Sequence, residues 1–438
     1  MTTPRRFEGD LPALLADLYL AGMPDYRDDL VQRIERTPQR PAWTLPERWL
    51  PVELVTSRTP AARVPWRQIG VLALIALLLA AALAAYIGSH QARLPAPFGP
   101  AGNGFIPFAK SGDIYLGDPV SGGTHPLVTG PGDDKSPVSS PDGTRIAFNR
   151  SVPGTAADGT ALFDTYVVNV DGSGLSRVSF TPIADSSRLS WAPDSRRLAI
   201  IQKVAGTSGC QGPSNCLAGK FDLVDTASGA SQTVATVDGL DFVQFRPPDG
   251  RELMYRALVD GKWGMFAVGL DGSPVRTLAQ PNVPGEMGLS FHAAMYSADG
   301  QRIFYEHGDA GGCCQLWVMN ADGTGAHEFM PLGPAWDGNA VPSPDGQWVA
   351  YWHNPNDGPI HGISIARADE TGRLLAAGPV LPGFGHYLWA PDSSKILLFP
   401  NDGSSGRAFL IDPHDGSFKT VAWDSDGDLD WQRIALPG

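Results

Sequence analysis

Several signatures of familiar protein classes are missing from this chain. The motifs G-x-S-x-G, H-E-x-x-H and G-x-x-x-x-G-K-[ST] do not occur in its 438 residues. The sequence therefore gives no direct sign of an α/β-hydrolase, a zinc peptidase or a phosphate-binding loop. Basic residues are also few, since 33 Lys and Arg stand against 46 Asp and Glu. Because nucleic-acid-binding domains carry basic stripes, this balance argues against nucleic acid as a partner.

Cysteine is scarce too, and its four copies fall in two pairs. Cys210 and Cys216 flank the sequence QGPSN, while Cys313 and Cys314 are adjacent. An even number of cysteines outside the cytoplasm favours disulfides, and four cysteines allow three pairings. We expect Cys210 and Cys216 to close a loop, with Cys313 and Cys314 forming a vicinal disulfide or staying reduced. A four-thiolate zinc site is disfavoured, because the spacing is not that of a zinc finger.

Charged residues are absent between Arg67 and Arg93. The run 69–88, which begins IGVLALIALLL, predicts a transmembrane helix, because about 20 apolar residues span a hydrocarbon core of roughly 30 Å. A signal peptide would lie much closer to the N-terminus. Arg58, Arg63 and Arg67 outnumber the basic residues close behind the run. The positive-inside rule then predicts a single-pass protein of the cell membrane, with its N-terminus in the cytoplasm and the rest outside.

Residues 1–68 show two short helical patterns. Apolar residues recur at helical spacing within 11–18 and 30–34, and the Pro- and Trp-containing stretch RPAWTLPERWLP follows. We expect a cytoplasmic tail with short helices, either passive or a docking segment for a cytoplasmic regulator with the tryptophans as anchors. The tail resembles those that precede single membrane spans in bacterial anti-sigma-type proteins, but it has no His or Cys of a zinc-containing anti-sigma domain. Residues 89–104, rich in Pro, Gly and Ala, predict a stalk.

One short turn sequence recurs through the rest of the chain. Ser-Pro-Asp-Gly at 140–143 has five variants, whose aspartates stand at positions 194, 249, 299, 345 and 392, 46 to 55 residues apart. Proline fixes φ for the first corner of a turn, Asp bonds its own backbone and Gly accepts positive φ. Each copy therefore predicts a tight hairpin between two strands. A strand-built repeat of this period is typical of a β-propeller.

The two ends of the repeat region complement each other. The runs FIPFA, DIYLGD and THPLVT, from Phe105 onward, match the second, third and fourth strands of a repeat, whereas DLDW at 428–431 matches a first strand. With six full repeats between them, we predict an all-β, seven-bladed β-propeller of four-stranded antiparallel blades over residues 105–438. Pairing of the two ends closes such a ring and removes its exposed sheet edges. If the C-terminal strand is not used in this way, the ring has six blades.

The repeats resemble a known family. SPDGTRIAF (140–148), LWVMNADGTG (316–325) and SPDGQWVAY (343–351) are similar to the WD40-like repeats of the TolB family of β-propellers. The resemblance covers residues 105–432 and implies the propeller fold without implying an activity. The membrane anchor, the N-terminal region and the seventh blade depart from TolB itself, which is periplasmic, six-bladed and serves envelope protein assembly.

The propeller fold predicts two unlike faces. Turns between first and second and between third and fourth strands share one face and are short, as in PDG, VDGSG and ADGTG. Loops between second and third strands share the other face with the links between blades, and several of them are long. We call these the short-turn face and the long-loop face. Because binding residues usually lie on variable loops, we expect a ligand or partner on the long-loop face.

The long-loop face collects the chemistry-bearing residues of the repeats. All four cysteines fall in its loops, and four histidines lie toward it, where they are either a ligand-binding set or separate solvated side chains: His307, His353, His361 and His386. The sharpest acidic run alternates carboxylates around a glycine and is either a calcium loop or a charged inter-blade loop. Its members are Asp424, Asp426, Asp428 and Asp430.

Two functions fit these observations. The first is a membrane-anchored, extracytoplasmic propeller that binds a protein or an envelope ligand and relays a signal to its cytoplasmic tail, as an anti-sigma-like sensor would. The alternative is an envelope hydrolase or lyase that uses the long-loop face, because the paired carboxylates of a glycosidase need no sequence motif. The sequence identifies no catalytic residue and no obligatory cofactor.

Overall fold

The protein is described here by a computed structural model. It describes residues 70–80, 95–155, 161–179, 183–184, 189–204, 218–259, 262–280, 294–307, 315–331, 336–354, 362–381, 385–400, 407–426 and 429–436. The chain divides into two units, Met1–Gln91 and Ala92–Gly438. In the first unit the described part is a helix over 70–80 with exposed side chains. Within the described residues, no helix has the length and apolarity needed to cross a membrane. The tail 1–68 lies outside them, as do the ends of the predicted span.

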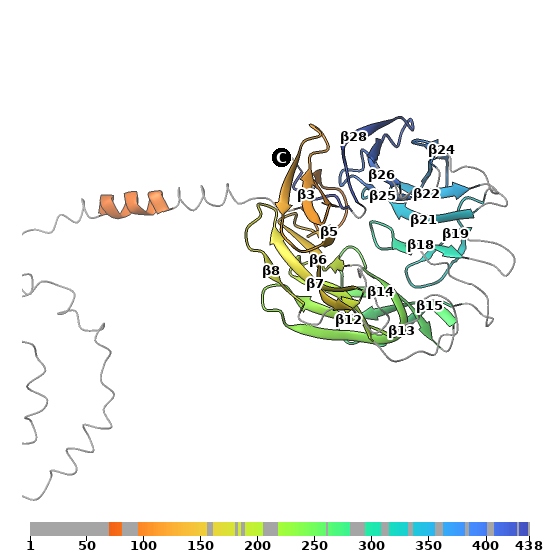
Figure 1. Cartoon of the computed structure of the whole chain (residues 1–438), viewed down its shortest axis with the longest axis horizontal. Coiled ribbons are helices and arrows are strands. Elements are labelled where there is room, and N and C mark those ends of the chain that lie inside the picture. Colours follow the sequence, from red (N-terminus) through yellow and green to blue (C-terminus); the bar gives the residue numbers. More distant parts are fainter. Residues whose placement is uncertain are drawn as a thin grey trace, which may run out of the picture. The chain divides into compact units, whose positions relative to one another are not determined.

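The second unit is built of strands that follow one another around a ring (Figure 1). The strands are β1 (Gly102–Asn103), β2 (Ile106–Lys110), β3 (Asp113–Gly117), β4 (Thr124–Val128), β5 (Asp134–Ser139), β6 (Arg145–Thr155), β7 (Ala161–Asn169), β8 (Ser176–Arg177), β9 (Ile183–Ala184), β10 (Leu189–Trp191), β11 (Arg197–Val204), β12 (Ala218–Asp225), β13 (Ser231–Phe245), β14 (Glu252–Val259), β15 (Lys262–Gly269), β16 (Arg276–Ala279), β17 (Met295–Tyr296), β18 (Arg302–His307), β19 (Gln315–Asn320), β20 (His327–Glu328), β21 (Trp336–Pro342), β22 (Trp348–Asn354), β23 (Ile363–Arg367), β24 (Arg373–Ala377), β25 (Gly385–Trp389), β26 (Ile396–Pro400), β27 (Arg407–Ile411), β28 (Phe418–Asp424) and β29 (Arg433–Ile434).

These strands form seven antiparallel blades. Blade 1 is β5–β8, with β9 added beside β7; blades 4, 5 and 6 are β17–β20, β21–β24 and β25–β28. Blades 2 and 3 share the long strand β13, whose first part pairs with β12 and whose last part pairs with β14. A register shift after Asp238 separates the two parts, so one continuous strand is the last strand of blade 2 and the first of blade 3.

The seventh blade joins the two ends of the repeat region. Its strands β2, β3 and β4 lack a first strand of their own, and Leu429 pairs with Phe108 in that place. Backbone N–H groups of Asp430 and Gln432 donate to the carbonyls of Pro107 and Phe105, at 3.1 Å and 2.9 Å. Just outside this pairing, β1 and β29 add a second pair of strands. The predicted closure by the C-terminal strand is confirmed, and the ring has seven blades rather than six.

The recurring turns have the geometry that their residues predict. In blade 1 the Ser140 N–H donates to the Arg145 carbonyl at 2.8 Å, and Gly143, with φ of 71°, donates to the Ser140 carbonyl. The Asp142 carboxylate accepts the N–H of Thr144 at 3.0 Å. Positive φ is where glycine is unstrained, which explains its place at the end of most copies.

Three turns depart from this pattern in instructive ways. Ser195 and Ser393 replace the glycine and take φ of 54° and 65°, so the backbone rather than the residue type is fixed at this position. In blade 3, Gly250 bonds back to Arg246, four residues earlier, where the other copies bond back three. This turn therefore holds one additional residue, and an arginine stands where the other turns have Ser or Ala.

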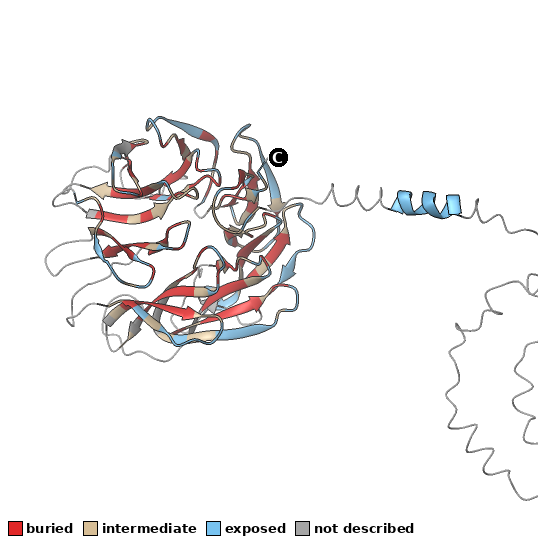
Figure 2. Cartoon of the chain, turned by 180° about the vertical axis from the view of Figure 1, so that it is seen from behind, coloured by how far each residue is buried: buried red, intermediate tan, exposed pale blue. Residues whose placement is uncertain are grey.

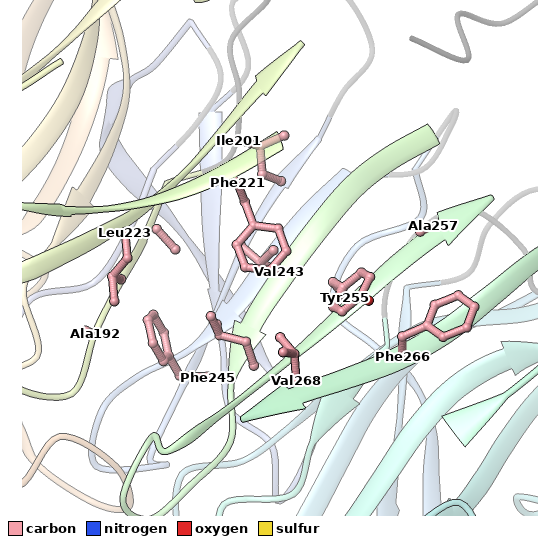
Figure 3. Close-up of a cluster of buried hydrophobic side chains, with 12 residues drawn as sticks. Ala192, Ile201, Phe221, Leu223, Val243, Phe245, Tyr255, Ala257, Phe266 and Val268 are labelled. Carbon is pink, nitrogen blue, oxygen red and sulfur yellow. The ribbon is translucent and has the colours of Figure 1, made fainter. Parts of the chain in front are cut away.

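The core lies between adjacent blades. Figure 3 shows the cluster between blades 2 and 3, in which Phe221, Val243 and Tyr255 come from neighbouring strands. Buried residues fill the inner strands, while turns and outer strands such as β4 are exposed (Figure 2). The indole N–H groups of Trp191 and Trp389 donate to main-chain carbonyls of the preceding blade, which ties one blade to the next.

Candidate functional site

The long-loop face carries a buried polar cluster where blades 4, 5 and 6 meet. It is built where β18 and β22 end and where β21 and β25 begin, so each strand brings one or two side chains to the same end of the ring. Its members are Glu306, Asp337, Asn339, His353 and Tyr387. We call this set the blade 4–6 cluster. Buried polar groups need hydrogen-bond partners. Here Asp337 bonds to His353, while Glu306 and Tyr387 bond to the main chain of Asn339.

One contact of the cluster joins a carboxylate to an imidazole. His353 Nδ1 lies 2.6 Å from Asp337 Oδ1, and the two side chains are 16% and 6% exposed. Asp337 and His353 are opposite each other in the β21–β22 ladder, which fixes their approach. Burial raises the pKa of Asp337, and the hydrogen bond from His353 offsets part of that rise. A carboxylate that orients an imidazole is an arrangement found at sites of proton transfer, although this imidazole is largely buried.

The rest of the cluster surrounds the backbone of Asn339. Glu306, which is 2% exposed, accepts the Asn339 N–H at 2.5 Å. The Tyr387 hydroxyl donates to the carbonyl of Asn339, and the carbonyl of Ala350 lies 3.2 Å from the same hydroxyl oxygen. Asn339 has φ of 58°, a conformation that non-glycine residues adopt at some cost. Three blades therefore hold one strained residue through both of its main-chain polar groups. Burial raises the pKa of Tyr387, which remains a donor at ordinary pH.

The other predicted histidines have separate surroundings. His307 packs against the indole of Trp317, with ring centroids 4.9 Å apart. His386 is exposed at the beginning of β25, and His361 lies outside the described residues. In the part of the chain that the structure describes, no group of three or more His, Cys, Asp and Glu side chains is placed to hold a metal ion. A shared histidine site stays a prediction.

The predicted acidic run is divided among different contacts. Asp424 pairs with Lys110 at 2.6 Å, and Asp426 accepts the backbone N–H of Ser111. Asp430 accepts the N–H of Ser139 at 2.7 Å, and burial raises its pKa. Asp424 and Asp426 thus join the end of blade 6 to blade 7, and Asp430 joins the closing strand to blade 1, so these carboxylates do not converge on a common point. Asp428 lies outside the described residues, as do all four cysteines, so the calcium and disulfide hypotheses stay predictions.

A pocket that the sequence did not predict lies on the short-turn face of blade 3. It has a volume of about 340 Å³ and is lined by the enlarged turn, by Glu252 and by the β15–β16 turn with Asp271 and Ser273. Glu252 accepts Arg276 Nη2 at 2.6 Å and the Tyr296 hydroxyl at 3.2 Å. Two features of the sequence could have indicated this pocket. One is the additional residue in the turn, and the other is the acidic residue at the first position of β14, where the same strand begins with Arg in blades 1, 2 and 4.

Comparisons with known proteins agree on the architecture. No family model and no curated protein matches the chain. An oligogalacturonate lyase in complex with manganese is 15% identical over 69% of this chain and 82% of its own, with a TM-score of 0.53. An oligogalacturonate lyase from Vibrio parahaemolyticus is 14% identical over 73% and 90%, with a TM-score of 0.52. TolB from Acinetobacter baumannii is 16% identical over 75% and 82%, with a TM-score of 0.46. The similar structures are thus TolB-like and other β-propeller proteins, and at these identities they show the fold alone.

Proposed function

We propose that this chain is a membrane-anchored binding scaffold, whose propeller holds a protein or an envelope ligand on its long-loop face outside the cytoplasm. The difference between the two faces carries this proposal. On the short-turn face the aspartate carboxylate of each turn accepts a hydrogen bond from the main-chain N–H two residues later, as at Asp142, Asp194 and Asp345. These carboxylates therefore stabilise their own turns. The long-loop face instead holds the blade 4–6 cluster and the longest connections, such as the one between β11 and β12.

In this proposal the cytoplasmic tail carries the signal onward. The propeller closes through its C-terminal strand, so the N-terminal side of the chain is left to continue toward the membrane and residues 1–68. An occupied propeller and a regulator bound to the tail would be two sites on one chain. Coupling between them is measurable as a change in one affinity when the other site is filled.

Site-specific photo-crosslinking tests the scaffold function. A photoreactive residue replaces Val380 on the long-loop face or Val120 on the short-turn face of the full-length protein in its own membranes; both side chains are exposed. We expect one discrete crosslinked product from position 380 and none from position 120. The same product from both positions, or from neither, would reject the long-loop face as the binding surface. Loss of a cytoplasmic partner on deletion of residues 1–68 tests the relay.

The alternative function, an envelope hydrolase or lyase, is favoured by one observation, the pairing of His353 with Asp337. His353 is largely buried and its ring is oriented by a carboxylate, as in the acid–base pairs of hydrolytic enzymes. Mass spectrometry of envelope oligosaccharides and peptides incubated with the protein tests this reading. Cleavage by the wild type and not by His353→Ala would establish an enzyme. Identical product patterns from the two proteins would remove the hypothesis.

A further inference from the structure

The pocket of blade 3 lies where three positions differ from the corresponding positions of other blades. Its volume of about 340 Å³ is at the lower end of the range for ligand pockets, roughly 300–1,000 Å³. Blades 1 and 4 show how the same positions are used elsewhere in the ring, and the comparison explains why the pocket is open in blade 3.

The first difference is at the beginning of the second strand. In blades 1 and 4 this residue is an arginine that reaches the next blade. Arg145 donates to Thr226 Oγ1 at 2.8 Å. Arg302 donates to the Ala368 carbonyl at 2.6 Å. In blade 3 the position holds Glu252, which is shorter, carries the opposite charge and lines the pocket instead of crossing it.

The second difference is at the end of the third strand. In blades 1 and 4 this position holds Asn169 and Asn320, whose side-chain amides each donate to a hydroxyl of their own turn at 3.0 Å. In blade 3 it holds Gly269, and a Cβ there would collide with Ser273 Oγ. The side chains of Ser273 and Asp271 therefore occupy the place that an asparagine takes in the other two blades, and they form one wall of the pocket.

The third difference is the enlarged turn, which brings Arg246 to the pocket. Its Nε donates to the Gly300 carbonyl of blade 4 at 3.0 Å, and its Nη1 lies 3.4 Å from Glu252 Oε1. These two contacts fix the guanidinium in place. Its Nη2 has no acceptor among the residues that the structure describes, so this nitrogen can donate to a ligand.

The cations at the pocket exceed what their partners neutralise. Glu252 lies between Arg246 and Arg276, at 3.4 Å and 2.6 Å, so two arginines and one glutamate leave a formal charge of +1. Arg251 and Asp249 are paired with each other at 3.4 Å and add no net charge. One wall of the pocket therefore keeps a surplus positive charge.

Asp271 supplies the opposite charge. Its Oδ1 accepts the Ser273 N–H at 2.9 Å, and within the described residues no cationic side chain forms an ion pair with it. Hydrogen bonds from Ser273, above all from its N–H, lower the pKa of Asp271, so the carboxylate is charged at neutral pH. The pocket thus presents one unmatched cation and one unmatched anion on different walls.

We propose that the blade 3 pocket binds a small zwitterion of the size of an α-amino acid, with the ligand carboxylate on Arg246 and the ligand ammonium on Asp271. Such a ligand matches both poles through charge-assisted hydrogen bonds, whereas a simple anion or cation matches one pole and is repelled by the other. The pocket volume limits the ligand to a single small molecule. This site is on the short-turn face and is separate from the surface proposed for a partner.

Calorimetric titration of the detergent-solubilised full-length protein tests the ligand class. Each of the twenty proteinogenic amino acids is titrated singly, and every one that binds is compared with its N-acetyl derivative and its amide, which each keep one of the two charges. We expect at least one amino acid to bind, and both capped forms to bind about tenfold more weakly or worse. No binding by any of the twenty, or a capped form that binds as tightly as its parent, overturns the proposal.

Three variants assign the binding to this pocket. Asp271→Asn removes the exposed carboxylate with little change in size and should weaken binding by about tenfold or more. Gly269→Asn gives blade 3 the residue of blades 1 and 4, which fills the pocket, and should abolish binding. Asp322→Asn, the same change at the same turn position of blade 4, is the matched control and should bind like the wild type. Binding that survives Asp271→Asn, or that Asp322→Asn weakens equally, contradicts the assignment even if Gly269→Asn does not fold.

Discussion

Aspartates in the turns between third and fourth strands make the stability of the propeller depend on pH. Asp171 accepts the N–H of Ser173 at 2.9 Å and its hydroxyl at 2.6 Å, and Asp322 makes the same pair of bonds to Thr324. These bonds lower the pKa of both carboxyls below the ordinary value of 3.8. A lowered carboxyl pKa stabilises the fold above the unfolded value, and that stabilisation disappears as pH falls through the folded value.

The first prediction is therefore a decline of the thermal midpoint that begins as the pH falls below about 4. The double variant Ser173→Ala, Thr324→Ala removes the hydroxyl donors and should show a smaller decline, because its midpoint is already lower at pH 7. Calorimetry between pH 7 and 2.5 measures both. Parallel curves for the two proteins would contradict a role for these bonds.

The pair in the blade 4–6 cluster gives a second prediction on the residue scale. Replacing His353 with Ala leaves Asp337 buried without its imidazole partner, which costs about 1–3 kcal/mol of unfolding free energy. His386→Ala removes an exposed imidazole from the same face and should change stability by no more than about 0.5 kcal/mol. Urea denaturation of the two variants compares them directly. Equal costs would mean that the Asp337 contact contributes nothing.

On the scale of elements, local patterns predicted the blades and their closure. The recurring turn, as at 140–143, predicted the blades, because each blade is built of neighbouring strands joined by such turns. The run at 428–431, which matches a first strand without a repeat of its own, predicted the closure, since only this last strand had to pair at long range. Such patterns did not predict the sharing of β13 by two blades, the β1–β29 pair or the packing of residues 95–104 against the ring. These features depend on contacts between distant segments, which have no periodic signal. The blade 4–6 cluster was missed for the same reason, although His353 was singled out.

The junction of the ring supplies the third prediction. Gln432 is buried; its Oε1 accepts the Phe105 N–H at 2.9 Å, and its Nε2 donates to the Gly143 carbonyl at 2.6 Å. Gln432→Ala leaves two main-chain groups without this partner, so we expect a loss of about 1–3 kcal/mol. Gln347→Ala, an exposed glutamine in a turn of the same face, is the matched control and should be nearly neutral. A loss of unfolding free energy at position 347 as large as that at position 432 would contradict a specific role for Gln432 at the junction.

At the scale of the whole molecule, residues 95–104 contact the ring, so the folded unit begins before the first blade strand, β2. The unit beginning at Ala92 includes Phe98, Ala101 and β1, all of which contact the ring. Half-burial of one phenylalanine contributes about 1 kcal/mol, and each main-chain hydrogen bond adds about 1 kcal/mol. Residues 95–438 should therefore be more stable than residues 105–438 by about 3 kcal/mol.

Denaturant unfolding of these two truncated chains, compared with the full-length protein, tests that boundary. The longer form should unfold at the same denaturant concentration as the second unit of the full chain, because no described contact of the ring involves residues before 95. The shorter form should unfold earlier, with its slope nearly unchanged, since it loses an attachment and keeps all seven blades. If residues 105–438 were as stable as residues 95–438, the contacts of residues 95–104 with the ring would contribute nothing to its stability.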